Sequence, residues 1–171
     1  LEPTDISPPH LIIVIFKVLP TASLKIADKQ GRHAVHWACA NDEPNPATIE
    51  AMLELDSNAA KRTDAEGMLP LHWACKAKKP SERAIKLLLY NYKRGAKKMT
   101  KRGTLPLHYA CANKSMTFGA VQTLLDAYDT AAMEFDGASG LLPLHSACKR
   151  EGMGEGVGIS SSWLKAVKEL L

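Results

Sequence analysis

The chain has 171 residues, of which 46% are hydrophobic and 23% charged, a composition typical of a folded globular protein rather than a disordered one. Its 22 Lys and Arg residues outnumber its 18 Asp and Glu residues, which gives a formal net charge of +4. The longest apolar run, residues 11–19, contains Lys17 and falls well short of the roughly 18 apolar residues of a membrane-spanning helix, so we exclude such a helix.

The run at residues 11–19 lacks a basic flank and a cleavage site of small residues, so we expect no signal peptide. The chain begins at Leu1 rather than at a methionine. It ends at Leu170 and Leu171, with nothing after them to cover an apolar helical pattern. We therefore expect the chain to be part of a longer protein or a processed product.

From residue 31 onward, a nine-residue motif occurs four times. It reads GRHAVHWAC at residues 31–39, GMLPLHWAC at 67–75, GTLPLHYAC at 103–111 and GLLPLHSAC at 140–148. The first glycines of these copies are 36, 36 and 37 residues apart. Self-similarity at one period is typical of a repeat protein, in which every copy folds as the same small unit.

Each copy predicts a turn and then a short helix. Pro70, Pro106 and Pro143 suit the first turn of a helix, because that position has no backbone hydrogen bond to lose. In the turn, Asp or Thr accepts local backbone hydrogen bonds and the motif glycine tolerates a positive φ. The predicted turns are residues 28–31, 64–67, 100–103 and 136–140.

A second helix is predicted in each of the first three copies. Thirteen residues after the motif histidine comes an aliphatic residue, followed three and four positions later by two more, which is the stripe of a helix that buries one face. Pro46 and the pair Pro80 and Ser81 indicate where two of these helices start. The stripes are Ile49, Met52 and Leu53, then Ile85, Leu88 and Leu89, then Val121, Leu124 and Leu125.

The motif Gly-x-x-Pro-Leu-His-x-Ala, followed by a helix with paired leucines, resembles the ankyrin repeat, whose usual motif is Thr-Pro-Leu-His at a period near 33. The resemblance covers about residues 11–171 and implies an all-α solenoid of stacked helix-turn-helix units with short turn or hairpin fingers. It implies a single ankyrin-repeat domain over residues 1–171. Its parts are a half-repeat at 11–30, in which residues 11–19 resemble a second helix, and repeats at 31–66, 67–102, 103–139 and 140–171.

The sequence departs from the family motif in its capping residues and its period. Leu69, Leu105 and Leu142 replace the family's threonine, so we expect the first helices to lose a capping hydroxyl, at about 1 kcal/mol each. The extra residues of each period lengthen the loops 41–46, 77–81 and 113–118.

The fourth copy is interrupted. Its stripe of Val167, Leu170 and Leu171 starts 22 residues after His145, and the excess includes the glycine-rich residues 151–158. This run matches no phosphate-binding motif, so we interpret it as a linker-like loop.

The spacing His-x-x-Cys in every copy resembles that of zinc ligands, but the repeat favours a structural role. Equivalent helices of neighbouring repeats lie roughly 8–10 Å apart, too far for a disulfide, which needs Cα atoms within about 7 Å, or for a shared zinc ion. We expect buried free thiols and a reducing compartment, namely the cytoplasm, the nucleus or an organelle interior. The cysteines are Cys39, Cys75, Cys111 and Cys148.

We expect neither catalysis nor a bound metal or cofactor. The resemblance implies that the motif histidines are neutral residues whose ring nitrogens bond nearby backbone. No Ser, Asp or Glu recurs at matching positions as the partner that a catalytic base would need.

Charge is distributed unevenly along the chain. Residues 76–102 contain eleven of the 22 Lys and Arg residues and a single acid, Glu82, so this stretch carries +10 and the remainder −6. Such a stretch is commonly a solvated face. The resemblance, however, implies a partner-binding concave surface built by the turn tips and first helices, with aromatic side chains at its edge. Here that surface is Lys29, Gln30, Arg32, Glu66, Met68, Trp73, Lys76, Lys101, Arg102, Thr104, Tyr109, Asn113, Leu141, Lys149 and Arg150.

Three functions fit these observations. The first is a protein–protein interaction module or scaffold whose basic concave groove binds an acidic surface or segment of another protein. The second is a binder of nucleic acid or an anionic membrane, which the lack of an RNA-binding motif and of interleaved aromatic residues disfavours. The third is the regulatory segment of a larger enzyme or channel.

Overall fold

The structure, a computed structural model, describes residues 21–151. Over this range it consists of α-helices and short 3-10 helices joined by loops and contains no strand, which confirms the all-α repeat fold. Several expected features lie outside the described residues: the helix at 11–19, most of the insert at 151–158 and the apolar stripe that begins at Val167.

The described helices alternate between two kinds. The first helices, which carry the motif histidines, are α2 (Ala34–Ala40), α4 (Pro70–Lys76), α6 (Pro106–Ala112) and α8 (Pro143–Glu151). The second helices are α3 (Pro46–Leu55), α5 (Glu82–Asn91) and α7 (Phe118–Ala127). A 3-10 helix follows each second helix, namely η2 (Ala59–Lys61), η3 (Lys93–Lys97) and η4 (Asp129–Met133), and η1 (Thr21–Lys25) comes before α2.

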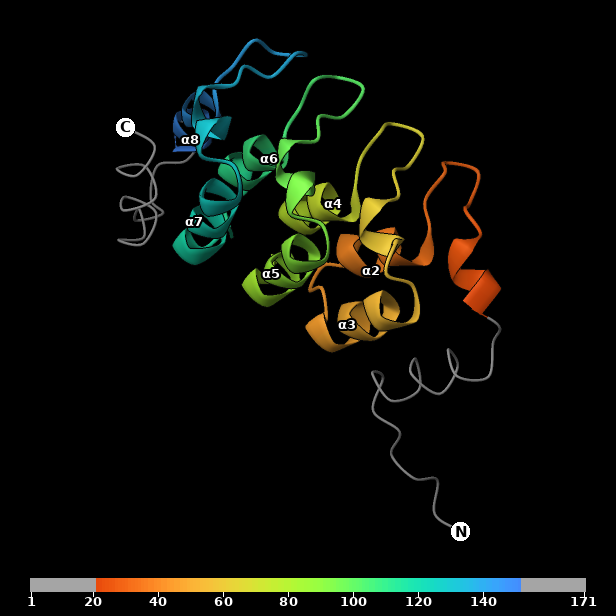
Figure 1. Cartoon of the computed structure of the whole chain (residues 1–171). Coiled ribbons are helices and arrows are strands. Elements are labelled where there is room, and N and C mark those ends of the chain that lie inside the picture. The colour runs from red at the N-terminus through yellow and green to blue at the C-terminus, as the bar shows by residue number, and fades with distance from the viewer. Residues whose placement is uncertain (1–20, 152–171) are drawn as a thin grey trace.

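The helix pairs stack side by side in chain order (Figure 1). Helix α4 lies against α2 and α6, and α6 in turn lies against α8, while α5 lies between α3 and α7. The loops before the first helices extend from one side of the stack. We call these loops fingers one to four and define them as residues 28–32, 64–68, 100–104 and 136–141.

Each finger closes on itself and is bonded to the next. The N–H of Asp64 donates to the carbonyl of Met68 at 3.0 Å, and the other fingers have the equivalent bond. Lys101 N–H donates to the Glu66 carbonyl at 2.9 Å, which links fingers two and three. The motif glycines have φ between +65° and +76°, the left-handed conformation that the sequence predicted for Gly31, Gly67, Gly103 and Gly140.

The predicted apolar stripes form one continuous core. Ile49, Ile85 and Val121, which begin the three stripes, are each 0% exposed, and Leu88 and Leu124 are nearly so. Because each stripe is buried against the equivalent helix of its neighbour, the stack has one core shared by all its repeats rather than one core per unit.

Helix capping differs between the first helices and the second helices. The second helices have side-chain caps from Asn45, Ser81 and Thr117. The first helices have no such cap, as the sequence predicted for Leu69 and Leu105, but the motif histidine contributes instead. Nδ1 of His72 accepts the Leu69 N–H at 2.9 Å, so the imidazole satisfies the backbone donor of the capping residue itself.

Candidate partner-binding groove

Two neighbouring cavities lie beside α4, and Trp73 and Lys76 of this helix line both of them. The first lies where fingers two and three meet the first helices. This cavity, of about 240 Å³, is lined by finger residues such as Asp64, Glu66 and Arg102 and by Trp73 and Tyr109 of α4 and α6. The other, of about 250 Å³, lies between the ends of α2 and α4 and shares Trp73 and Lys76 with the first. We call the surface formed by the finger tips and these two cavities the finger groove.

The structure brings six of the predicted partner-contacting residues together around the first of these cavities: Glu66, Met68, Trp73, Lys76, Arg102 and Tyr109. Met68 is only 6% exposed, so it forms a floor rather than a rim. The side chains of Trp73 and Tyr109 are half-buried, and those of Glu66, Lys76 and Arg102 are exposed. The cavity therefore combines an apolar interior with charged groups of both signs at its mouth.

The remaining predicted residues are distributed along the fingers and first helices. Thr104 is buried, and its hydroxyl donates to Asp136 at 2.6 Å; Asn113 uses its amide to donate to the Cys75 and Ala77 carbonyls of the preceding repeat. Leu141 is half-buried, and the side chain of Arg150 lies outside the described residues. Lys29, Gln30, Lys101 and Lys149 are exposed, and Arg32 is half-buried.

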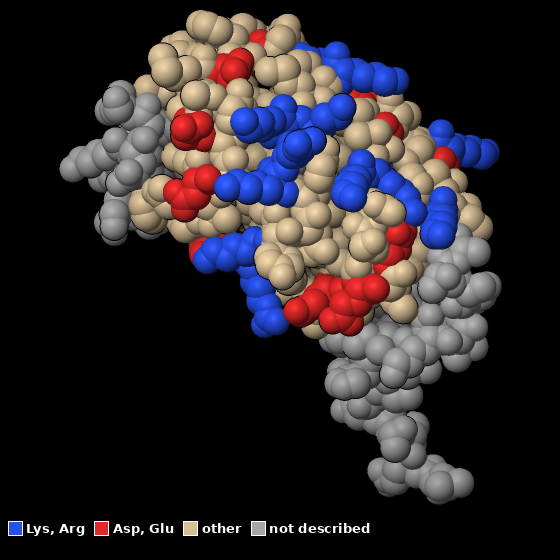
Figure 2. Space-filling view, in the orientation of Figure 1, with Lys and Arg blue, Asp and Glu red and all other residues tan. Residues whose placement is uncertain are grey.

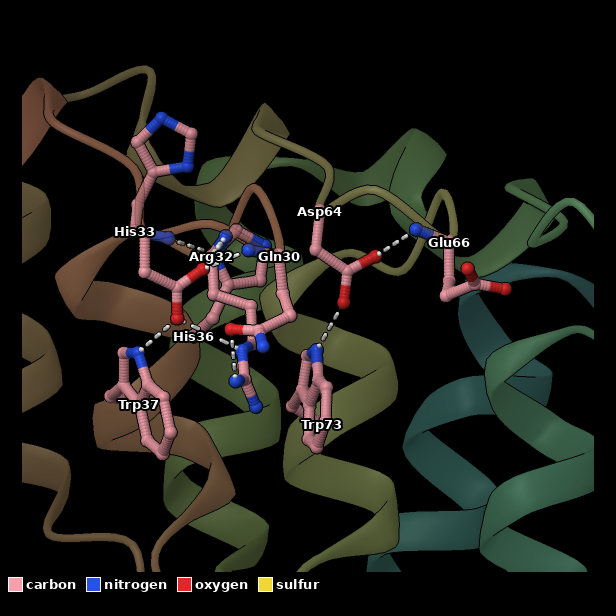
Figure 3. Close-up of polar contacts among 9 residues, drawn as sticks. Gln30, Arg32, His33, His36, Trp37, Asp64, Glu66 and Trp73 are labelled. Carbon is pink, nitrogen blue, oxygen red and sulfur yellow. Dashed lines mark hydrogen bonds and ion pairs between the residues drawn. The ribbon is translucent and has the colours of Figure 1, made fainter.

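An Asp–Trp contact positions the tryptophan of each of the first two repeats (Figure 3). Oδ2 of Asp64 accepts the indole N–H of Trp73 at 3.0 Å, while its Oδ1 accepts the backbone N–H groups of Glu66 and Met68. Asp28 makes the same three kinds of contact in finger one, with Trp37 as its indole partner at 3.2 Å. Sequence reasoning missed this pair, although Asp and Trp lie nine residues apart in both of these repeats.

The guanidinium of Arg32 lies between two indole rings (Figure 3). Its central carbon is 4.1 Å from the centroid of Trp37 and 5.8 Å from that of Trp73. Nε donates to Asp28 at 3.1 Å and Nη2 donates to Gln30 at 2.8 Å. A cation therefore lies between the tryptophans of the first two repeats and holds this part of the groove in one arrangement.

The basic stretch at residues 76–102 does not form one surface. Lys79 and Arg83 each pair with a glutamate of the preceding repeat, Glu43 and Glu50, both at 3.2 Å. Lys78 pairs likewise with Asp42, whereas Lys86 pairs with Glu82 of its own helix. Much of the charge imbalance read from the sequence is thus neutralised between successive repeats, and only three cations of the stretch belong to the finger groove: Lys76, Lys101 and Arg102.

The other cations of the stretch gather at η3, on the face seen in Figure 2. Lys93, Arg94, Lys97 and Lys98 are exposed and form no ion pair with any described residue. Figure 2 shows Lys and Arg side chains gathered in the middle of this face, over η3. We call these four residues the η3 cluster.

The motif histidines have structural partners. Nε2 of His36 lies 3.1 Å from the Arg62 carbonyl of its own repeat and 3.2 Å from the Met68 carbonyl of the next repeat, and Nε2 of His108 contacts the Glu134 and Leu141 carbonyls in the same way. Burial lowers the pKa of His36 and His108, and it lowers that of His72 to about 4. These imidazoles are therefore neutral links between repeats at neutral pH.

The cysteines follow the prediction with one exception. Cys39, Cys75 and Cys111 are fully buried and form no disulfide, and burial raises the pKa of Cys39 and Cys75. Cys148 forms no disulfide either, but it is exposed, so the expectation of four buried thiols was wrong for this residue. Its helix, α8, has no following repeat among the described residues to lie against it.

Searches of the described residues found no group of three or more His, Cys, Asp or Glu side chains placed to hold a metal ion. None of the helices within residues 21–151 is long and apolar enough to cross a membrane.

Among known protein families, the model for ankyrin repeats in three copies matches residues 11–101, which is more than half of the chain. No curated protein matches the chain.

Proposed function

The chain belongs to the ankyrin repeat family, whose repeats are generally protein–protein interaction modules, and on this premise we propose that it is a scaffold that binds an acidic segment of another protein in its finger groove. One observation carries the proposal. The fingers carry the exposed cations Lys29, Lys101 and Arg102, and Arg102 lines a cavity that has the aromatic walls Trp73 and Tyr109. Aromatic walls supply contact area, and the cations steer an acidic partner toward them.

The chain is best understood as a binding module without catalytic activity. The groups that most resemble catalytic residues are the motif histidines. Nδ1 of each of the four accepts a backbone N–H, and Nε2 of His36 and of His108 contacts two carbonyls. We propose that it works in a reducing compartment, since no disulfide joins its four cysteines. As a single domain made of a half-repeat and four repeats, it would offer its partner one continuous groove.

A test of the groove compares two charge reversals of equal size on different surfaces. Lys101→Glu with Arg102→Glu changes the finger groove, whereas Lys97→Glu with Lys98→Glu changes the η3 cluster. Each variant and the parent chain would be immobilised and exposed to a native extract, and bound proteins would be quantified by mass spectrometry. We expect proteins retained by the parent to be lost from the groove variant and kept by the control. Equal retention by both variants would count against the groove.

The η3 cluster favours a second candidate function, binding to nucleic acid or to an anionic membrane. Its four cations are exposed and have no acidic partner among the described residues, which is the arrangement that phosphate binding requires. Titration of RNA or DNA binding against salt tests it. A steep slope that the Lys97→Glu and Lys98→Glu pair reduces would support this function, and no binding near physiological salt would reject it.

A further inference from the structure

The first repeat contains a complete binding site for a guanidinium group, filled by its own Arg32. The site has three parts: the Asp28 carboxylate, which accepts from Nε; the Gln30 amide oxygen, which accepts from Nη2; and the face of Trp37, which the guanidinium covers at 4.1 Å (Figure 3). Two fixed acceptors and an aromatic face match the planar, forked geometry of arginine and do not suit the compact ammonium of lysine.

The second repeat contains the same three parts without the arginine. Asp64, Glu66 and Trp73 lie 36 residues after Asp28, Gln30 and Trp37. Asp64 is held as Asp28 is, by two backbone N–H groups on Oδ1 and by the indole N–H on Oδ2. The residue 36 positions after Arg32 is Met68, which is 6% exposed and whose thioether side chain cannot donate a hydrogen bond to either carboxylate. We call Asp64, Glu66 and Trp73 the second-repeat cradle.

The cradle differs from that of the first repeat in ways that strengthen it. Glu66 has a charged carboxylate where Gln30 has a neutral amide, and an ionised acceptor roughly doubles the strength of a guanidinium hydrogen bond. The Asp64 carboxylate is 8% exposed, so its charge is screened less by water than that of a surface acid. The third repeat has Thr100, Arg102 and Tyr109 at these positions and so lacks the acids.

A cavity opens where the missing side chain would lie. All three cradle residues line the cavity of about 240 Å³, and Tyr109 forms its opposite wall. This volume is below the roughly 300 Å³ at which small-molecule sites begin, so it suits a single side chain. Three cations stand nearby: Arg32, 5.8 Å from the Trp73 centroid; Lys76, 5.3 Å from that centroid; and Arg102, 3.9 Å from Glu66 with both side chains largely exposed. The Arg102–Glu66 contact is a weak ion pair that an incoming group can replace.

We propose that the second-repeat cradle binds an arginine side chain of the partner, between Trp73 and Tyr109 and against Asp64 and Glu66, as the first repeat binds its own Arg32. The proposal rests on the proposed function, because it places this arginine within the acidic segment that the groove binds. The acids of the segment would face the exposed cations of the fingers, and the arginine would enter the cavity.

The test uses two defined peptides and one spectroscopic readout. The first peptide has an arginine between two glycines, flanked on each side by two glutamates; the second has citrulline, the uncharged isostere, in its place. Binding to the full chain is followed by the NMR shift of the Trp73 indole N–H, which lies in the cradle. We expect the arginine peptide to bind about tenfold more tightly, the loss that removing one charge-assisted pair produces.

Two reciprocal variants make the test specific. Met68→Arg supplies the missing guanidinium from within and should abolish the preference for arginine over citrulline. Arg32→Met empties the first-repeat site and should make the Trp37 indole respond to the arginine peptide, a gain that loss of folding cannot produce. Glu66→Gln, at an exposed position, should weaken the preference without changing the circular dichroism.

The outcomes separate this inference from the proposed function. Equal affinity for the two peptides, with binding lost in the Lys101→Glu and Arg102→Glu variant, would reject the arginine site and leave the acidic-segment groove standing. No binding of either peptide would overturn both. A tenfold preference that Met68→Arg leaves unchanged would also overturn the inference, because arginine would then bind elsewhere.

Discussion

Gly103 and Gly137 approach each other so closely that neither finger could carry a side chain at this point. The N–H of Gly137 donates to the Gly103 carbonyl at 3.2 Å, and a Cβ added to Gly103 would lie 2.8 Å from the Cα of Gly137. Gly103 also has φ of +76°. The contact fixes finger four against finger three, and with it the far end of the finger groove.

Gly103→Ala should therefore lower the free energy of unfolding by more than the cost of placing alanine at a positive φ. The positive φ costs about 1 kcal/mol for alanine, and the collision adds to it. Gly140→Ala is the matched control, since Gly140 has φ of +65° but nothing within 4 Å of an added Cβ. Urea unfolding followed by circular dichroism measures both. Equal losses in the two variants would show that the finger contact contributes nothing.

Leu88→Asp should unfold the stack. Leu88 is 2% exposed in the shared core, and burying an unpaired carboxylate there costs several kcal/mol, a large part of the stability of a domain of this size. Leu124→Asp should behave in the same way. Tyr90→Asp, on the same helix as Leu88 but 90% exposed, should leave the helical circular dichroism unchanged. Unchanged thermal stability in the two leucine variants would contradict the stacked-repeat core.

Stability should fall as the pH is lowered from 7 to about 4. The folded pKa of His72 is about 4 and its ordinary value is 6.5, so between these values the unfolded chain binds the proton and the folded chain does not. For His72 alone the loss is about 3 kcal/mol, and His36 and His108 add to it in the same direction. Urea midpoints measured across this range test the effect. His72→Asn should flatten the dependence, and a flat profile in the parent chain would contradict neutral, buried imidazoles.

Thiol reactivity should separate one cysteine from the others. Cys148 is exposed, whereas Cys39, Cys75 and Cys111 are 0% exposed. A thiol reagent such as an aromatic disulfide should modify one equivalent rapidly in the native chain and three more only after denaturant is added. Cys148→Ser should remove the rapid phase. Rapid modification of all four cysteines would contradict the burial of Cys39, Cys75 and Cys111.

The sequence was sufficient for the repeated unit because its helices depend on local signals. Pro46 and Ser81 lie at helix starts, and the stripe beginning at Ile85 is buried as its spacing predicts. The 3-10 helices after the second helices were not predicted. Small buried residues such as Ala59 and Ala96 allow the chain to turn tightly against the stack there, and short runs of this kind carry no periodic signal.

Charge was the least predictable property, because it depends on contacts between repeats. Lys79 and Glu43 are 36 residues apart, so their pairing appears only when the two repeats are placed side by side. The basic stretch consequently divides among ion pairs, the finger groove and the η3 cluster. The Asp64 and Trp73 pair could have been read from its recurrence as Asp28 and Trp37, but a spacing of nine matches no helix or strand period.

The most direct measurement locates the partner on the chain by amide hydrogen exchange, with and without a protein captured by the finger groove. Our account predicts slower amide exchange in fingers one to three and in the first helices α4 and α6. The exchange rates of the second helices α3 and α5 and of the η3 cluster should stay unchanged. Protection confined to η3 and the second helices, with the fingers exchanging as in the free chain, would contradict it.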